Sequence, residues 1–309
     1  MPIVSIRHRT TYRYRNPVAF GEHRVMFRPL EGYDQRVLSA ELRITPEPSL
    51  LRNVHDVFGN CVSIARFAGR SDVLTFEGWV RLEHTAQPGF AGLDCEVDLY
   101  RGGGAQTYSA DDLPDLARSI ARQHPDPDGE IAAWARRFVR PVGTTRLQTL
   151  LSDMTHAIRA EFAYGVRLHG EPQSPTETLA ARSGSCRDFA VLMIEAARSL
   201  GLAARFASGY VYSASRGKGR AGGGHTHAWA RVYLPSCGWI EFDPTNGIVG
   251  NTDLVRVAIT RDPRQATPLH GTWSGLPNDY LGMDVEVDIA VEEVVLAQPV
   301  AQLRVGELR

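Results

Sequence analysis

Residues 183–200 of this 309-residue chain read SGSCRDFAVLMIEAARSL, and this stretch predicts a buried helix that begins at a cysteine. Ser185 and Asp188 stand three residues apart, as in a capping box at a helix start. Apolar residues cover nearly every side of the helix over 189–197, so its body should lie in a core. Its first turn must still reach a surface or a cleft, where unpaired N–H groups and the helix dipole favour a thiolate at Cys186. The cysteine is therefore a candidate nucleophile, although a free cysteine is more often a small buried hydrophobe.

Composition narrows the class of protein. The length suits one large domain or two modest ones, and 43% hydrophobic with 22% charged residues is ordinary for a globular protein. The formal net charge of −1 gives no indication of a nucleic-acid or anionic-membrane partner. The four cysteines are scattered and include no CxxC pair, which argues against a disulfide framework or a zinc ribbon. With no signal-like or membrane-length apolar stretch, we expect a cytoplasmic protein.

The first hundred residues predict a β-rich domain. β-branched and aromatic residues alternate with charged ones near the N-terminus, and similar apolar runs follow between Pro and Gly breakers. The expected strands are 6–15, 37–44, 62–67 and 73–82. Short strands at this spacing suggest a sandwich-like domain. His8, His55 and Asp56 stand alone here, and isolated residues of these types are more often solvated or hydrogen-bonded in place than functional.

After about residue 105, the spacing of the apolar residues changes twice. Helical spacing of apolar residues comes first, and strand-like stretches follow the cysteine helix. The expected helices are 111–124, 129–140, 144–161 and 175–182, and the expected strands are 203–212, 225–234, 239–243 and 285–296. The glycine-rich loop 213–224 lacks the strand and helix context of a phosphate-binding loop. We expect an α+β protein with a β-rich domain over 1–105, a catalytic domain over 106–270, and a C-terminal extension over 271–309 whose strand returns to a sheet.

Two residues downstream of the cysteine could complete the chemistry of a thiol nucleophile. Such a nucleophile needs a base to take its proton, and the base needs a group that fixes its tautomer. His227 lies 227 − 186 = 41 residues after Cys186 in an expected strand, and Asp243 lies 243 − 227 = 16 residues later at the end of the next. A hairpin can bring the last two side by side. Taken alone, a histidine in a strand is more often a satisfied core or surface group, and an aspartate before proline is more often a turn residue.

Sequence blocks around these residues carry a resemblance to a known family. GSCRDFAVLMIEAARSLGLAARFASGY spans 184–210, and HTHAWARVYLPSCGWIEFDPTNG spans 225–247. In order, they present a cysteine at a helix start, His-Ala-Trp, and Gly-Trp with Asp-Pro-Thr. This pattern, over about residues 145–250, resembles the transglutaminase-like superfamily of papain-type cysteine enzymes.

Regions outside this core extend the resemblance. HRTTYRYRNPV and DVFGN, in the first sixty residues, resemble the β-rich domain that precedes bacterial members of the superfamily. TRDPRQATPLHGTWSG, from Thr260, resembles the segment that follows their catalytic domain, but Pro263 stands where an aromatic residue is usual. The fold implied is a β-sandwich-like N-terminal domain followed by a papain-like α+β core, in which the helix-borne cysteine packs on an antiparallel sheet.

The resemblance also implies a role for each residue of the core. Cys186 would be the nucleophile, His227 the general base and later acid, and Asp243 the residue that orients the imidazole. Attack on a carboxamide carbonyl would give a thioester acyl-enzyme, which water or an amine then resolves. One N–H donor to the oxyanion would be that of the cysteine itself.

Four neighbouring residues are weaker candidates for a supporting or substrate-binding role. Tyr164, in the EFAYG segment, would line the cleft. Arg187 would contact substrate or simply be solvated, and Asp188 has a capping or support role as readily as a catalytic one. Trp229 should share the strand face of His227 and could shield it, while core packing explains a tryptophan at least as well.

The expected chemistry needs no metal or other cofactor. His225 shares a strand face with His227 and could suggest a metal site with Cys186, but no fourth ligand stands at zinc-like spacing. We expect a peptide or protein substrate, with water or an amine as acyl acceptor. Hydrolysis is favoured over crosslinking because the chain has no acidic calcium-binding loop of the kind that animal crosslinking enzymes use. The alternative is a binding or assembly module that kept the fold and lost the activity.

Overall fold

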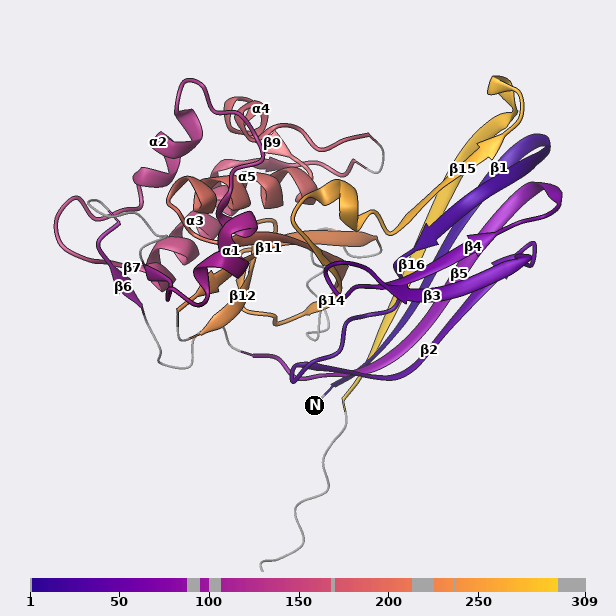
Figure 1. Ribbon diagram of the computed structural model, residues 1–309, viewed down its shortest axis with the longest axis horizontal. Helices are drawn as coiled ribbons and strands as arrows, with labels where there is room; N and C mark the ends of the chain where they lie inside the picture. The colour runs from indigo at the N-terminus through magenta and orange to yellow at the C-terminus, as the bar shows by residue number, and fades with distance from the viewer. Residues whose placement is uncertain are drawn as a thin grey trace, which may run out of the picture.

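The computed structural model describes residues 2–87, 95–99, 107–167, 170–212, 225–235 and 237–293. Residues 2–84 and 269–293 supply a long curved sheet, and the middle of the chain forms an α+β unit beside it (Figure 1). The strands of the curved sheet are β1 (Pro2–Val25), β2 (Gln35–Thr45), β3 (Leu50–His55), β4 (Cys61–Arg66), β5 (Arg70–His84), β15 (Leu269–Ser274) and β16 (Tyr280–Glu293). The expected mixture of a β-rich region and an α+β core is confirmed, while the loop 213–224 lies outside the described residues.

Strand β1 organises the curved sheet. The strand order is β2-β5-β1-β4-β3, and both β15 and β16 also pair with β1. β16 runs antiparallel to the first half of β1, and β15 to the second half. The sheet folds over a cluster of buried apolar side chains from β1, β2, β4, β5 and the residues after β1, which gives it the two-layered look of a sandwich: Tyr14, Val18, Phe20, Val25, Phe27, Ile44, Ala65, Leu74 and Phe76 (Figure 1).

The alternation in β1 separates an inner face from an outer one. Val4 and Ile6 are buried, whereas Arg7 points outward and pairs with Glu77 of β5 at 2.6 Å. Exposed ion pairs of this kind contribute at most about 1 kcal/mol each. Burial of the even-numbered side chains therefore fixes the register of this strand. Strand β3 was not predicted, because its residues are mostly exposed and show no such alternation.

The α+β unit holds the predicted cysteine helix at its centre. Its antiparallel sheet has the order β13-β12-β11-β10-β14, and α5 packs on β10 and β11 and against α2 and α4. The prediction of a buried helix is confirmed, since most of α5 is inaccessible to solvent. The elements are α1 (Leu113–Ile120), α2 (Glu130–Arg136), α3 (Leu147–Glu161), α4 (Pro175–Ala181), α5 (Cys186–Ser199), β10 (Ala204–Val211), β11 (Thr226–Leu234), β12 (Gly238–Asp243), β13 (Ile248–Val249) and β14 (Leu254–Thr260).

Short elements complete the chain. Two strand pairs join loops around the helices, and two 3-10 turns flank β15. The pairs are β6 (Glu96–Val97) with β7 (Thr145–Arg146) and β8 (Ala163–Tyr164) with β9 (Ser183–Gly184), and the turns are η2 (Pro263–Ala266) and η3 (Pro277–Asp279).

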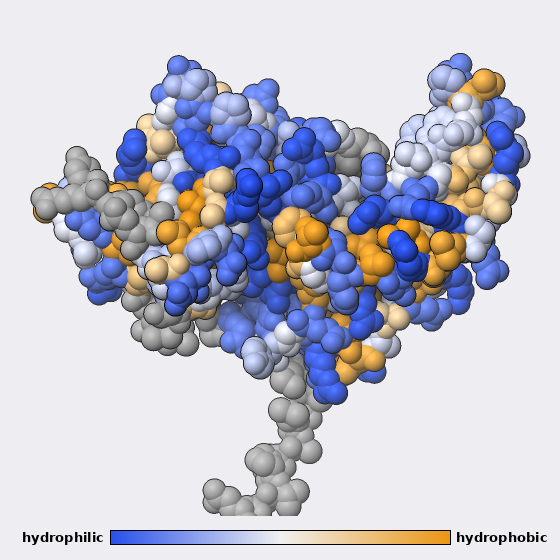
Figure 2. Space-filling view, in the orientation of Figure 1, coloured by the Kyte–Doolittle hydropathy of each residue, from blue (hydrophilic) through white to orange (hydrophobic). Residues whose placement is uncertain are grey.

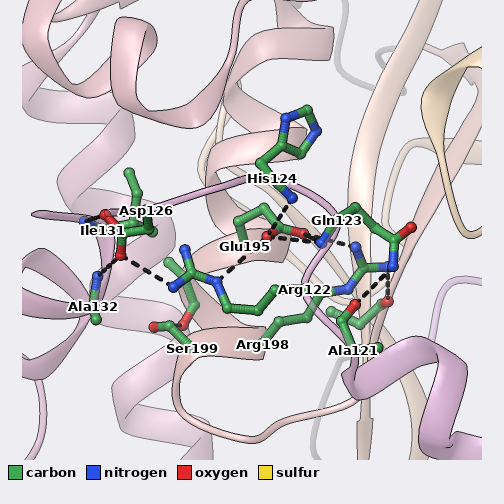
Figure 3. A network of polar contacts seen from close by, with 12 residues as sticks. Ala121, Arg122, Gln123, His124, Asp126, Ile131, Ala132, Glu195, Arg198 and Ser199 are labelled. Carbon is green, nitrogen blue, oxygen red and sulfur yellow. Dashed lines mark hydrogen bonds and ion pairs between the residues drawn. The ribbon is translucent and has the colours of Figure 1, made fainter. Parts of the chain in front are cut away.

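A buried polar network anchors the far end of α5 (Figure 3). The carboxylate of Glu195, which is fully buried, accepts hydrogen bonds from the backbone N–H groups of Gln123 at 3.2 Å and His124 at 3.3 Å. It also pairs at 2.8 Å with Arg198, whose guanidinium donates to three backbone carbonyls as well. Because the chain turns toward this carboxylate, α1 ends at residue 120 and is shorter than the expected helix 111–124.

The second helix is also shorter than expected. The prediction of a helix over 129–140 is wrong at its end, because α2 stops at Arg136. Tight turns follow, in which the N–H of Phe138 bonds to the carbonyl of Ala135 at 3.2 Å, and the N–H of Arg140 turns to the hydroxyl of Thr145 at 3.0 Å. The hydroxyl of Thr145 thus accepts a hydrogen bond from the N–H of Arg140, which in a longer helix would bond to a helix carbonyl.

The curved sheet docks along β14, an edge strand of the central sheet. The side-chain amide of Asn60 donates to the carbonyl of Ile259 at 2.9 Å and accepts from its N–H at 2.8 Å. In the same way, the side-chain amide of Gln35 donates to the carbonyl of Arg256 at 2.7 Å and accepts from its N–H at 3.0 Å. The guanidinium of Arg256 adds two bonds to Asp34 at 2.7 and 2.9 Å. Two amide side chains thus satisfy edge groups that a further strand would otherwise bond.

One hydrophobic core crosses the boundary between the two parts. It combines Val4 and Ile6 of β1 with residues of α3, α5 and the central sheet. Apolar residues also reach the surface over the curved sheet, at the right of the view (Figure 2). Among the described residues, no helix has the length and apolar character needed to span a membrane.

Candidate active site

Cys186 is the first residue of α5, and a buried carboxylate holds the turn in front of it. Oδ2 of Asp188 accepts hydrogen bonds from the N–H of Ser185 at 2.7 Å and from its hydroxyl at 2.8 Å. Oδ1 accepts from the N–H of Gln173 at 2.7 Å and pairs with Arg167. The predicted capping interaction is thus part of a larger anchor, and this anchor fixes where the cysteine sits.

Glycine is required directly before this turn. A Cβ atom on Gly184 would lie 2.8 Å from Cβ of Asp188 and 3.2 Å from the ring of Phe189, closer than side chains pack. Gly184 also pairs with Tyr164 through the parallel strands β8 and β9, which brings this tyrosine beside the cysteine turn. Burial, with the nearby Cys186 and Asp243, raises the pKa of Tyr164 to about 12, so the hydroxyl keeps its proton at neutral pH.

His227 and Asp243 meet across the hairpin formed by β11 and β12. Nε2 of His227 lies 2.9 Å from Oδ2 of Asp243, and both side chains are fully buried. The turn after β12 orients the carboxylate, because Oδ1 accepts from the N–H groups of Thr245 at 2.9 Å and Asn246 at 3.3 Å. The side-chain amide of Asn246 then donates to Oδ2 at 2.8 Å.

The carboxylate sets the charge of the imidazole. Burial alone would lower the pKa of His227, but the charge and hydrogen bond of Asp243, together with the Cys186 thiol, outweigh burial and raise this pKa to about 10. Burial opposes ionisation of Asp243, and its interactions with His227 and Asn246 still hold its pKa below the usual range. Nδ1 of His227 is buried and has no hydrogen-bond partner among the described residues. The imidazole can therefore carry and transfer a proton at Nδ1 while Nε2 stays bound to the carboxylate.

Cys186 and His227 line one cavity of about 190 Å³. Tyr164 and Arg187 line it as well. Asp243 lies behind the imidazole, buried in the protein. The structure therefore brings the three principal candidates together in the order thiol, imidazole and carboxylate.

The remaining predicted residues support this arrangement from its sides. Arg187 donates to the backbone carbonyls of Gly170 and Arg167, each at 3.0 Å, and so ties these two residues to the start of α5. Trp229 is fully buried and stacks on His227, with ring centroids 6.0 Å apart and 28° between the planes. It both covers the imidazole and packs in a core.

His225 also lines the cavity, but the structure gives no metal centre around it. Among the described residues, no three His, Cys, Asp or Glu side chains lie close enough together to hold a metal ion.

Comparisons with known proteins identify the family of this chain. The family model for the bacterial transglutaminase-like N-terminal region matches residues 4–83, and that for the transglutaminase-like superfamily matches residues 132–244. Uncharacterized protein Rv2569c of Mycobacterium tuberculosis and uncharacterized protein Mb2599c of Mycobacterium bovis are each 30% identical over 297 residues, covering 92% of this chain and 91% of the relative. This chain belongs to the transglutaminase-like superfamily.

A solved structure shares the fold of this transglutaminase-like protein over nearly its whole length. A candidate cysteine protease from Cytophaga hutchinsonii aligns with a TM-score of 0.68, covering 96% of this chain and 92% of that one. Its sequence is 18% identical, so the likeness concerns the fold alone. The resemblance inferred from the sequence blocks is confirmed for family and fold.

Sequence reasoning missed several residues of the transglutaminase-like site. Asn246 holds the carboxylate of Asp243, and its place in the Asp-Pro-Thr-Asn turn was a usable signal, because side chains in such turns bond neighbouring groups. Arg167 gave no signal, because its partner Asp188 lies 21 positions away. His8 was set aside as isolated and in fact lines the cavity, hydrogen-bonded to the hydroxyl of Tyr210 at 2.9 Å.

Proposed function

We propose that this protein is a cysteine amidase or peptidase that attacks a carboxamide or peptide carbonyl through a thioester acyl-enzyme. The observation that carries the proposal is the row of Cys186, His227 and Asp243 at one cavity, with the thiol at the start of a buried helix. Nucleophile, base and orienting group in this order are the parts that acyl transfer requires.

In the acylation step the sulfur of Cys186 adds to the carbonyl carbon, and the C–N bond then breaks. His227, with its pKa raised to about 10, is protonated at neutral pH and stabilises a thiolate beside it. Its proton passes to the leaving nitrogen, which departs as ammonia or as an amine. Asp243 remains ionised and holds the imidazole in place throughout.

In the deacylation step His227, now neutral, takes a proton from water while the oxygen adds to the thioester carbon. The C–S bond breaks, the carboxylic acid leaves and the thiolate of Cys186 returns. If an amine enters in place of water, the product is a new amide. The proposal favours water, because the chain offers no acidic calcium-binding loop of the crosslinking type.

Two donors suit the oxyanion of the tetrahedral intermediate. The backbone N–H of Cys186 belongs to the first turn of α5, where α-helical N–H groups have no partner within the helix. Tyr164 lines the same cavity, and its hydroxyl stays protonated, since burial raises its pKa to about 12. Donors fixed in advance lower the barrier more than mobile water does.

The first test is intact-mass spectrometry of glutamine- and amide-bearing peptides after incubation with the protein, with and without a primary amine. We expect cleavage or loss of one amide in the wild type and none in Cys186→Ala. An amine adduct would establish transfer instead of hydrolysis. No product with any peptide would favour a binding module that kept the fold.

Thiol reactivity separates an active cysteine from a silent one without a substrate. Iodoacetamide should modify Cys186 much faster than Cys61, Cys95 or Cys237, and His227→Ala should remove that advantage. Equal rates at all four cysteines in the wild type would contradict the enzymatic proposal.

A further inference from the structure

The curved N-terminal sheet supplies one wall of the cavity at Cys186. Thr10 and Tyr12 of β1 line it together with Val285 and Met283 of β16. The register pairs Thr10 with Val285 and Tyr12 with Met283. Directly paired residues and residues two apart share one face of a sheet, so the four side chains form a single patch, called here the sheet wall.

The position of the sheet wall is fixed by contacts of the residues that precede it on the same face of β1. Val4 and Ile6, further along the same face of β1, lie in the core shared with the α+β unit. His8, the next residue on that face, bonds to Tyr210 of β10 at 2.9 Å and stacks on Phe27 with ring centroids 3.9 Å apart. The sheet wall therefore faces the cysteine in a defined geometry.

The sheet wall carries no ionised group, and its only polar side-chain groups are the hydroxyls of Thr10 and Tyr12, of which that of Thr10 is bonded to Nε2 of His8 at 3.2 Å. Met283, Val285 and Tyr12 present thioether, methyl and ring surface, and burial lowers the pKa of the adjoining His8 to about 3, so this imidazole is neutral. Apart from the histidines, the titratable charged residues among the described residues that line the cavity are Arg167 and Arg187, which belong to the α+β unit and not to the sheet wall. Both are engaged, with Asp188 and with backbone carbonyls. A charged substrate group at the sheet wall would lose water and gain no partner.

We propose that the sheet wall is a specificity site, which binds an uncharged apolar side chain beside the scissile carboxamide. This inference rests on the proposed function and adds a substrate class to it, namely peptides with a leucine- or phenylalanine-like residue next to the attacked amide. A cavity of about 190 Å³ has room for such a side chain, which would displace several waters.

The test uses three reagents with one reactive group on the full-length protein: iodoacetamide, its N-(2-phenylethyl) derivative and its N-(2-aminoethyl) derivative. Rates at Cys186 are measured by mass spectrometry and divided by the rates of the same reagents with free cysteine. We expect the phenylethyl reagent to exceed iodoacetamide by about tenfold and the cationic reagent to fall below it. No apolar advantage in the wild type would overturn the proposal.

Variants locate the selectivity. Met283→Glu should abolish the phenylethyl advantage and raise the relative rate of the cationic reagent, while the matched control Asp284→Asn, exposed on the other face, should change neither. If Met283→Glu fails to fold, Val285→Ala should shift the preference toward a bulkier naphthylethyl reagent. Unchanged ratios in a folded variant would also overturn the proposal.

The variant His227→Ala keeps this result distinct from the proposed function. It should slow all three reagents at Cys186 by the same factor and leave their ratios intact. If the wild type prefers the phenylethyl reagent but His227→Ala slows none of the reagents, the result would support the sheet wall and contradict the activated thiol. If His227→Ala slows the reagents but the wild type shows no preference among them, the result would support the activated thiol and contradict the sheet wall.

Discussion

The chemistry of this protein depends on a few buried side chains whose charge is set by their neighbours. His227 would be neutral if burial alone acted on it, and Asp243 reverses that effect at a distance of 2.9 Å. The carboxylate itself stays ionised because the charge and hydrogen bond of His227, followed by the hydrogen bonds from the turn at Thr245 and Asn246, lower its pKa against burial. Each of these residues is therefore best probed by a substitution that keeps its shape and changes one property.

Tyr164→Phe removes one hydroxyl from the cavity. If this hydroxyl donates to the oxyanion, kcat should fall about 100-fold with little change in KM, as for the loss of one oxyanion donor elsewhere. Steady-state kinetics on an amide peptide measures both constants. The control is Tyr33→Phe, since Tyr33 is fully exposed. An equal effect of the two variants would refute the role.

The pair of His227 and Asp243 predicts how stability varies with pH. The pKa of His227 is about 10 in the folded protein and about 6.5 in the unfolded chain, so the stabilisation is complete below pH 6.5 and is lost as pH rises toward 10. Asp243, with a lowered pKa, loses its contribution at acid pH instead.

Chemical denaturation of Cys186→Ala between pH 6 and 9 measures the part of this dependence that Asp243 supplies, because the thiol, which also raises the pKa of His227, is absent. The free energy of unfolding should fall as pH rises, and adding Asp243→Asn should flatten the slope. Asp72→Asn, an exposed change of the same type, serves as control. A slope that persists in the Asp243→Asn protein would show that another group titrates.

Helix α5 is held at both ends by buried carboxylates. Asp188 binds the turn before the cysteine and the segment around Gln173, and Glu195 binds the chain after α1. A helix anchored only at its far end could tilt its first turn, and the thiol would move with it. The anchors explain how a buried helix presents one residue to a cavity.

Asp188→Asn tests the first anchor. It leaves Arg167 without its ionic partner and replaces an acceptor oxygen by an NH2 group, so the free energy of unfolding should fall by about 3 kcal/mol. Urea denaturation measures the loss, and iodoacetamide should react more slowly with Cys186. Asp115→Asn, in the exposed first turn of α1, should cost no more than about 0.5 kcal/mol.

In the molecule as a whole, segments that lie far apart in the sequence line one cavity: β1, the central part of the chain, and β16. Residues near the N-terminus and residues of β16 form the sheet wall, and the centre of the chain supplies the reacting groups. The amides of Asn60 and Gln35 join the parts along β14. The N-terminal region therefore contributes to the cavity as well as to stability.

Asn60→Ala tests this joint. It leaves the N–H and carbonyl of Ile259 without their amide partner, and we expect a loss of about 3 kcal/mol in the free energy of unfolding. The phenylethyl advantage at Cys186 should also shrink, because the sheet wall loses support. Asn53→Ala, on the exposed strand β3, is the matched control. A phenylethyl advantage that persists in destabilised Asn60→Ala would show that the joint does not hold the wall.

The sequence by itself determined the features that local rules govern. The capping pair at Ser185 and Asp188 predicted the start of α5, and alternation predicted β1, because both depend on neighbours within a few residues. The family pattern named Cys186, His227 and Asp243, whose roles stay predictions until the experiments above are done. Helix ends were less predictable. Helix α1, for example, ends just before Gln123, whose backbone N–H donates to the carboxylate of Glu195, 72 positions away in the sequence.

Only the tertiary structure decided which distant residues surround the cysteine. Asn60 meets Ile259 across 199 positions, and Tyr12 stands beside Met283 from the opposite end of the chain. No periodicity marks such pairs, because a strand shows only that one face is buried and does not show what covers it. The sequence thus indicated the chemistry of the site, while the packing of the curved sheet on β14 determined the wall that the substrate would meet.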